Sequence, residues 1–230
     1  MAGVSRLQYS TEIKVIRIMC SGRVDLSFIF RAFLKGADAV FIGGCHINDC
    51  HYNTEGNYDA LGNTLMSRKL LEHIGVNPER LRLEWVSAGE GIRFADIMND
   101  FSMKMKTAGP LGTSEGISKN ELKSRIEAVI KLIPYIKLVE RERLRIPVRT
   151  EKEYNRFFSS DEFNRLFNEL ILDKLAISRI ILLLRKSPLS TGEISNILGL
   201  NPSEVSRHIN SSSKQGLVRY DVNRKCYALA

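Results

Sequence analysis

The first 110 residues alternate short apolar runs with longer amphipathic patterns, and this alternation constrains the fold more than any other feature. Buried strands are predicted at residues 13–19, 39–42 and 81–86, where β-branched or apolar side chains follow one another. Apolar side chains at helical spacing predict helices at residues 26–34, 58–74 and 91–105. Strands that alternate with helices favour a parallel sheet covered on both faces. We therefore expect residues 1–110 to form an α/β domain with a flavodoxin-like or Rossmann-like parallel sheet.

The next segment has a different composition. Gly, Pro, Thr and Ser gather at residues 109–116, which indicates a domain boundary. Amphipathic patterns follow at residues 118–139, where Pro134 is expected to interrupt the helix, and at residues 161–172. Residues 111–172 are therefore expected to form an α-helical linker.

The end of the chain has the element order of a winged helix. Helices are predicted at residues 173–184, 191–198 and 202–215, the last with Pro202 in its first turn. Two short strands, residues 217–222 and 225–229, flank a tight turn. This order resembles ArsR/MarR-type winged-helix modules, so we expect a winged helix-turn-helix domain (α+β) at residues 173–230.

Charge is distributed unevenly between these parts. The net charge is +8, of which residues 1–110 carry +1 and the remainder +7. A DNA-binding winged helix would place polar and basic side chains of its second motif helix in a major groove and those of its hairpin on phosphates. These side chains are Ser203, Ser206, Arg207, Asn210, Lys214, Arg224 and Lys225. Residues 161–230 carry only +3, so protein docking is favoured and nucleic acid is the less favoured partner.

The sequence also limits where the chain works. No apolar run approaches the ~20 residues of a membrane span. Four charged residues among the first 19 leave no apolar core for a signal peptide. We expect a cytoplasmic protein with no membrane partner, in which the four cysteines do not form structural disulfides.

Three cysteines are expected to meet at one edge of the sheet. Cys20 and Cys45 each stand at or just after the carboxyl end of a predicted strand, and these ends lie together in a parallel sheet. Cys50 follows Cys45 at C-x4-C spacing, in a loop that can fold back toward the same edge. Thiolates at this spacing suit a [2Fe–2S] cluster, and thiolate–imidazole sets also suit zinc. Cys20, Cys45 and Cys50 are therefore the candidate ligands, with the kind of metal left open.

The fourth ligand is not evident from the cysteine count. His46 and His51 are the candidates, whereas Cys226 lies on the distant hairpin and is expected to be an ordinary half-buried residue. The simpler alternative is that Cys20 and Cys45 are small residues in tight turns. A C-x5-R phosphatase loop is excluded because Leu26 stands at the required position, and no G-x-G-x-x-G motif is present.

Several longer runs resemble a known family over about residues 2–110. The runs are residues 2–9, 17–25, 36–40, 43–46, 49–52, 55–58, 78–80 and 83–88. They resemble the delta subunit of methyl-viologen-reducing hydrogenase, an iron–sulfur subunit often found beside heterodisulfide reductase subunits. Family members usually begin with a further strand and a C-x-x-C pair, and this chain starts after that point. The resemblance thus implies a sheet that lacks its first strand. Three explanations are open: the gene is truncated or split, another polypeptide supplies the strand, or the cluster has been lost.

The resemblance implies a non-catalytic electron-transfer subunit of an oxidoreductase complex. Its [2Fe–2S] cluster would be held by Cys20, Cys45 and Cys50, with Ser21, His46 and His51 as candidate tuning residues. Its partners would be the flavin subunit of heterodisulfide reductase and hydrogenase or formate dehydrogenase-type subunits. The alternative is a metal- or redox-sensing winged-helix transcriptional regulator, and zinc is the alternative to the cluster.

Overall fold

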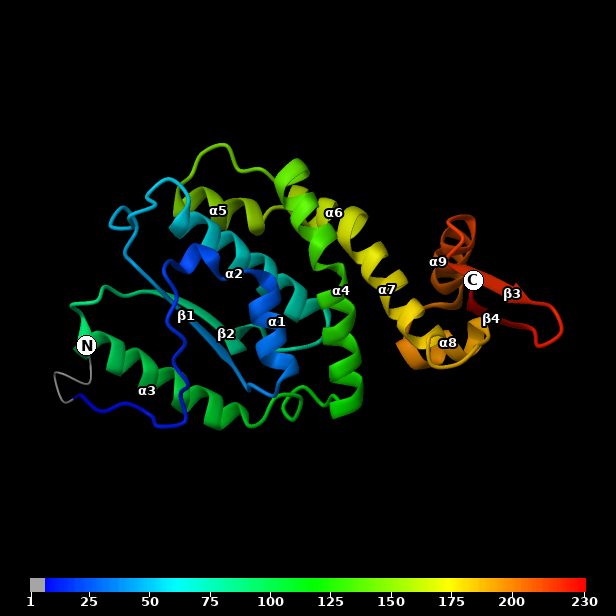
Figure 1. The fold of residues 1–230 in the computed structure, drawn as a ribbon, viewed down its shortest axis with the longest axis horizontal. Coiled ribbons are helices and arrows are strands. Elements are labelled where there is room, and N and C mark those ends of the chain that lie inside the picture. Colours follow the sequence, from blue (N-terminus) through cyan, green and yellow to red (C-terminus); the bar gives the residue numbers. More distant parts are fainter. Residues whose placement is uncertain (1–6) are drawn as a thin grey trace. The chain divides into compact units, whose positions relative to one another are not determined.

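The computed structural model of the chain describes residues 7–230, which form two compact units (Figure 1). The first unit is Met1–Ile126 with Ile146–Ser160, and the second is Glu127–Arg145 with Asp161–Ala230. Helix α4 (Lys119–Arg143) contributes residues to both units. The division into residues 1–110, 111–172 and 173–230 stays a prediction, and residues 2–6 of the first family-like run lie outside the described residues.

The first unit contains a small parallel sheet. Strand β1 (Val40–Gly44) pairs in parallel with β2 (Leu81–Trp85), and the register joins Val40 to Leu81. Phe41 packs against Phe101 of helix α3 (Gly91–Ala108), with their ring centroids 5.9 Å apart. Helices α1 (Leu26–Leu34) and α2 (Gly56–His73) contact β1 and β2 respectively. The predicted α/β class and parallel pairing are confirmed, and the sheet has two strands in the described part of the chain.

Residues 13–19 do not form the predicted strand. Within residues 7–230 they belong to no ladder, and Ile16 and Met19 are 84% and 90% exposed. The preceding residues are tied to α3 instead, where Tyr9 stacks edge-on against Phe94 with centroids 5.3 Å apart. The prediction is wrong because β-branched residues favour an extended backbone but do not supply a neighbouring strand. A strand also requires hydrogen-bond partners for its N–H and C=O groups.

The helices of the first unit lie close to their predicted positions. Asp25 caps α1 by accepting a hydrogen bond from the Ser27 amide at 2.7 Å. Helix α3 ends at Gly109, whose φ of 72° is a left-handed conformation that glycine adopts without a Cβ clash. Short 3₁₀ turns, η1 (Ser21–Arg23) and η2 (Pro78–Arg80), precede α1 and β2.

A buried ion pair holds the Gly-rich segment after α3. The Arg80 side chain is 0% exposed and its Nε donates to Glu115 Oε1 at 2.6 Å. Its Nη1 donates to the carbonyls of Asp38 at 3.1 Å and Gly109 at 3.0 Å. Burial raises the pKa of Glu115, but hydrogen bonds from Arg80 and Ser114 outweigh it and lower that pKa to about 2. Since residues 109–116 are fixed in this way, they pack as an ordered part of the first unit.

A segment beyond α4 returns to the first unit, and its helix α5 (Glu151–Phe158) was not predicted. Thr150 caps α5, and Tyr154 stacks on Tyr58 with ring centroids 5.7 Å apart. The Trp85 indole N–H lies 3.4 Å from Glu151 Oε1. Helix α5 thereby packs beside the amino-terminal part of α2.

The second unit follows the predicted order closely. It contains α6 (Asp161–Phe167), the π-helical turn η3 (Asn168–Leu172), α7 (Asp173–Leu184), α8 (Thr191–Leu198), α9 (Pro202–Lys214), β3 (Val218–Asp221) and β4 (Cys226–Leu229). Strands β3 and β4 pair antiparallel as the wing. Pro134 does not interrupt α4 as predicted, since the helix continues through it with Ile133 and Ile136 buried beside it.

One apolar core joins the elements of the winged helix. Its fully or nearly fully buried members are Ile180, Leu184, Ile194, Val205, Ile209 and Val218. They come from α7, α8, α9 and β3, so each element contributes its apolar face to a single cluster. Among the described residues, no helix is both long enough and apolar enough to span a membrane.

Candidate functional site

The candidate site lies where the first unit brings Cys20 and Cys50 together, with Cys45 at the end of β1. Cys20 precedes η1, Cys45 directly follows β1, and Cys50 stands in the turns between β1 and α2. Cys50 is buried, Cys20 is half-buried and Cys45 is exposed. The site therefore extends from the interior of the first unit to its surface.

The sulfur atoms of Cys20 and Cys50 are 3.9 Å apart. Two thiolates that each lie about 2.3 Å from one tetrahedral metal would be separated by about 3.8 Å, so this spacing suits a shared metal. Burial raises the pKa of Cys20, and the nearby thiols of Cys50 and Cys45 raise it further. Cys45 thus lies within electrostatic range of Cys20, and the donor set is one that iron–sulfur clusters and zinc both accept.

Two glycines allow this close approach. A Cβ on Gly56, the first residue of α2, would lie 2.8 Å from the Sγ atoms of both Cys20 and Cys50. A Cβ on Gly22 would lie 2.6 Å from the Gly56 carbonyl oxygen. The two sulfurs consequently stand against the first residue of α2.

Asn57 holds the loop that carries Cys45. Its Nδ2 donates a 2.7 Å hydrogen bond to the Cys45 carbonyl, and the residue is 1% exposed. Its Oδ1 is buried and accepts no hydrogen bond from a described residue. Asn57 stands in one of the family-like runs, but no role was predicted for it. The available signal was an amide side chain directly before the predicted helix at residues 58–74 and seven residues after Cys50.

The two candidate histidines are placed differently. His46 Nε2 lies 2.6 Å from Glu90 Oε2, which also accepts the Ser87 amide at 2.7 Å. The Ser87 hydrogen bond is the largest cause of the lowered pKa of Glu90, followed by the one from His46. His51 is exposed and stacks edge-on against Tyr52, with ring centroids 5.2 Å apart. Within residues 7–230, no three His, Cys, Asp or Glu side chains are close enough to form a complete metal site.

The remaining residues singled out from the sequence divide between the units. Ser21 is buried, and a Cβ on Gly44 would lie 2.8 Å from its Oγ, so this hydroxyl sits at the end of β1 beside the cysteine loop. Cys226 lies in β4 of the second unit, where it is 8% exposed. It is therefore more buried than the half-buried residue that was predicted.

Together these features define an α/β protein with a thiol-rich site at the carboxyl edge of its parallel strands, followed by a winged helix. Two family models match the chain: methyl-viologen-reducing hydrogenase, delta subunit, over residues 1–109, and bacterial regulatory protein, arsR family, over residues 178–220. The resemblance read from the sequence is confirmed. The chain belongs to the methyl-viologen-reducing hydrogenase delta subunit family.

Curated relatives cover the same part of the chain. An iron-sulfur subunit of the F420-non-reducing hydrogenase of Archaeoglobus profundus is 49% identical over 110 residues, which are 48% of this chain and 80% of that protein. The corresponding iron-sulfur subunit of the vhc hydrogenase of Methanococcus voltae is 48% identical over 118 residues, or 51% of this chain and 81% of that protein. One subunit of the ferredoxin/F(420)H(2)-dependent CoB-CoM heterodisulfide reductase of Methanosarcina acetivorans is 42% identical over 113 residues. These are 49% of this chain and 14% of that protein.

Proposed function

We propose that this chain is a [2Fe–2S] electron-transfer subunit that relays electrons between a hydrogenase or other dehydrogenase and a heterodisulfide reductase-type flavoprotein. The observation that carries the proposal is the 3.9 Å separation of the Cys20 and Cys50 sulfurs. The names of its relatives, which are iron-sulfur subunits of hydrogenases and one subunit of a heterodisulfide reductase, support the same function.

Cys20, Cys45 and Cys50 would hold the cluster as thiolates. When bound, a [2Fe–2S] cluster supplies one-electron transfer. The fourth ligand is His46, His51 or a residue of another polypeptide. His46 must first leave Glu90, to which its Nε2 is hydrogen-bonded. Replacing each histidine by alanine separates these cases, because only the true ligand changes the EPR spectrum of the cluster.

The surrounding residues position the thiols and control access to them. Gly56 keeps side-chain atoms away from the buried sulfurs, and Asn57 fixes the Cys45 carbonyl. Cys45 is exposed, which places one ligand where a docked partner can approach the electron-carrying centre. This function needs no acid–base residue, so the chain would act as a relay within a complex that also contains hydrogenase or formate dehydrogenase-type subunits.

The proposal is tested by metal analysis of the full chain purified without oxygen. We expect about two irons and two sulfides per chain and a rhombic EPR signal after dithionite reduction. Cys20→Ser and Cys50→Ser should each lose most of the iron, whereas Cys226→Ser should keep it because Cys226 lies in the other unit. Stoichiometric zinc without iron, or iron content unchanged in Cys20→Ser, would contradict the proposal.

A substitution beside the sulfurs provides a second test. Gly56→Ala introduces a Cβ that would lie 2.8 Å from both buried sulfurs, so it should reduce iron content although every candidate ligand remains. Gly62→Ala in the same helix is the matched control, because its Cβ would meet only the Tyr154 ring at 3.4 Å. Equal iron in the two variants would show that the sulfur spacing does not matter for binding.

A further inference from the structure

Two thiols of the candidate site are in direct contact. The sulfurs of Cys20 and Cys50 are 3.9 Å apart, and both residues are free cysteines in the structure. A disulfide bond is about 2.05 Å long, so the sulfurs must approach each other by roughly 2 Å to form one. The pair is therefore within reach of oxidation to a disulfide.

The backbone around the two thiols allows this approach. Cys20 precedes η1 and Cys50 stands in the turns before α2, so neither residue belongs to a helix or a strand. Gly56 bounds the space where the sulfurs meet, since a Cβ there would lie 2.8 Å from both of them. Because that Cβ is absent, the two side chains can rotate toward each other while α2 stays in place.

The two thiols differ in exposure. Cys20 is half-buried, whereas Cys50 is only 8% exposed. A small molecule can therefore reach the Cys20 sulfur first, and Cys50 then reacts with what is already bound there. An accessible thiol beside a second, resolving thiol is the usual arrangement of redox-sensitive cysteines.

The position of the pair along the chain separates the effect of the fold from that of the sequence. Cys20 and Cys50 are 30 residues apart, whereas Cys45 and Cys50 are five apart. In an unfolded chain, loop closure favours the shorter loop by roughly fifteenfold, since its probability falls as the 3/2 power of loop length. A disulfide between Cys20 and Cys50 would therefore report the folded geometry.

We propose that in the metal-free chain Cys20 and Cys50 form a reversible disulfide, which closes the site to metal. The consequence for metal rests on the proposed function, because these are two of the thiols that would hold the cluster. The disulfide itself requires only the two thiols and does not depend on which metal the site takes.

The oxidant is a low-molecular-weight disulfide. The Cys20 thiolate attacks one of its sulfurs, the S–S bond breaks, and one thiolate leaves with the electron pair of that bond. The Cys50 thiolate then attacks the Cys20 sulfur of this mixed disulfide and displaces the second thiolate. The protein loses two electrons and two protons, and the oxidant gains them as two thiols. An added dithiol reverses the same steps.

Oxidation removes two of the three candidate ligands at once. A cysteine binds metal as a thiolate, and neither sulfur of a disulfide is one. The ratio of thiols to disulfides around the chain would therefore decide whether an empty site can be loaded.

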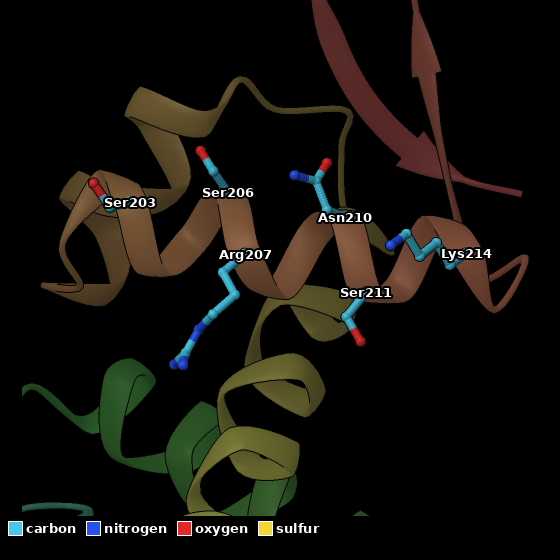
Figure 2. Close-up of a pocket in the computed structure, with 6 residues that line it drawn as sticks. All are labelled: Ser203, Ser206, Arg207, Asn210, Ser211 and Lys214. Carbon is cyan, nitrogen blue, oxygen red and sulfur yellow. The ribbon is translucent and has the colours of Figure 1, made fainter.

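The fourth cysteine provides a reference. Cys226 is 8% exposed in β4 and is the one cysteine of residues 161–230. A shallow depression of this unit lies along α9, and Figure 2 shows the hydroxyl, amide and basic side chains that line it. These residues are Ser203, Ser206, Arg207, Asn210, Ser211 and Lys214. Since Cys226 is buried and has no thiol partner within the winged helix, it should stay reduced.

Peptide mapping of the full, metal-free chain tests the proposal. The reduced chain is incubated without oxygen with bis(2-hydroxyethyl) disulfide at about pH 8.5, because the thiolate is the reacting form. Free thiols are then alkylated. Digestion with trypsin and Asp-N places the cysteines in separate peptides, residues 18–23, 38–48, 49–58 and 226–230.

We expect the peptide of residues 18–23 to be linked to that of residues 49–58, and dithiothreitol to release both. In urea, the link between residues 38–48 and 49–58 should predominate instead, as loop closure requires. No link in the folded chain, or the same distribution of links as in urea, would overturn the proposal.

Removing the resolving thiol gives a second readout. In Cys50→Ser, Cys20 should remain as a mixed disulfide with the probe, because no neighbouring thiol displaces it. Cys226→Ser is the matched control and should form the same internal link as the unchanged chain, since Cys226 lies in the other unit. Equal amounts of mixed disulfide at Cys20 in the two variants would contradict the role of Cys50.

Metal loading tests the consequence. The disulfide form should take up at least tenfold less ferrous iron, supplied with sulfide, than the reduced form, and dithiothreitol should restore the uptake. Equal uptake by the two forms would overturn the control of loading. If the reduced chain takes up no iron, the proposed function fails, and the same comparison made with zinc and the peptide map still decides this inference.

Discussion

The polar contacts that fix the thiol site and the buried ion pair differ in range from those that cap the helices of the winged helix. In the first unit, Asn57 reaches the Cys45 carbonyl and Arg80 reaches Glu115, across 12 and 35 residues. In the winged helix, Glu193 and Glu204 bond amides three residues away. These buried bonds of the first unit thus join segments that are distant along the chain, whereas the capping bonds of the winged helix close within single helical turns, and its elements are joined by the apolar core.

This difference has consequences for stability and for the site. A non-local pair carries the entropic cost of closing a loop, and its loss leaves a buried charge or dipole without a partner. A cap remains near water, so its loss costs less. Disturbing the first unit should therefore affect both folding and the thiol site, whereas disturbing a cap should leave the rest of the winged helix in place.

The largest expected effect comes from Glu115→Gln. It leaves the Arg80 guanidinium buried without a counter-charge and should destabilise the first unit by about 3–5 kcal/mol. Trp85, the single tryptophan, lies in β2, so its fluorescence during urea unfolding reports on this unit. Glu72→Gln, which breaks an exposed pair with Lys69 in the same unit, is the control and should change little. A Glu115 variant as stable as this control would show that the buried pair does not support the unit.

The pH dependence of the same pair has a definite sign. The pKa of Glu115 is lowered from 4.5 to about 2, so the unfolded state binds more protons between these values. The ionised Glu115 side chain therefore contributes roughly 3 kcal/mol to the free energy of unfolding above pH 4.5. This contribution is lost as pH falls toward 2. Unfolding free energies measured from pH 6 to pH 2 should show this loss, and Glu115→Gln should remove it.

The next effect is expected at Asn57, where folding and the thiol site meet. Asn57→Ala removes the hydrogen bond to the Cys45 carbonyl and should cost about 1–3 kcal/mol while lowering iron retention. Asn63→Ala is the matched control in α2, because it removes a comparable hydrogen bond, to the Val24 carbonyl, away from the cysteine loop. Equal iron in the two variants would argue against a positioning role for Asn57.

A smaller effect is expected from the caps of the winged helix. Asn201→Ala removes the amino-terminal cap of α9 and should cost about 1 kcal/mol, measured as a shift of the thermal transition by circular dichroism. Iron content should not change, since Asn201 belongs to the second unit. A loss as large as that from Glu115→Gln would contradict the contrast between the units.

The smallest expected effect is the pH response of His208. Burial lowers the pKa of His208, a change that Asp173 partly opposes and Arg207 reinforces. The ordinary pKa of a histidine is 6.5, so below this pH the unfolded state binds more protons at His208 than the folded state does. The stability that the neutral ring contributes is therefore present above pH 6.5 and decreases as pH falls. His208→Gln should flatten this part of the stability profile of the second unit, and an unchanged profile would exclude the effect.

The same contrast explains what the sequence predicted well. Local signals, such as apolar side chains at helical spacing and Pro202 in the first turn of α9, led to helix boundaries within a few residues of those observed. Helix α5 was missed because it is short and its position depends on Tyr154 packing against Tyr58. Pro134 was weighted too heavily, since tertiary packing stabilises α4 on both sides of it.

The sequence by itself determined the order of the elements of the winged helix, the family, and which three cysteines are the candidate ligands. Tertiary structure alone decided that the Cys20 and Cys50 sulfurs lie 3.9 Å apart, that Arg80 is buried against Glu115, and that residues 13–19 form no strand. The physical reason is the range of the interactions. Caps and helical periodicity act within a few residues, whereas strand pairing, buried ion pairs and thiol convergence require contacts between segments that are distant along the chain.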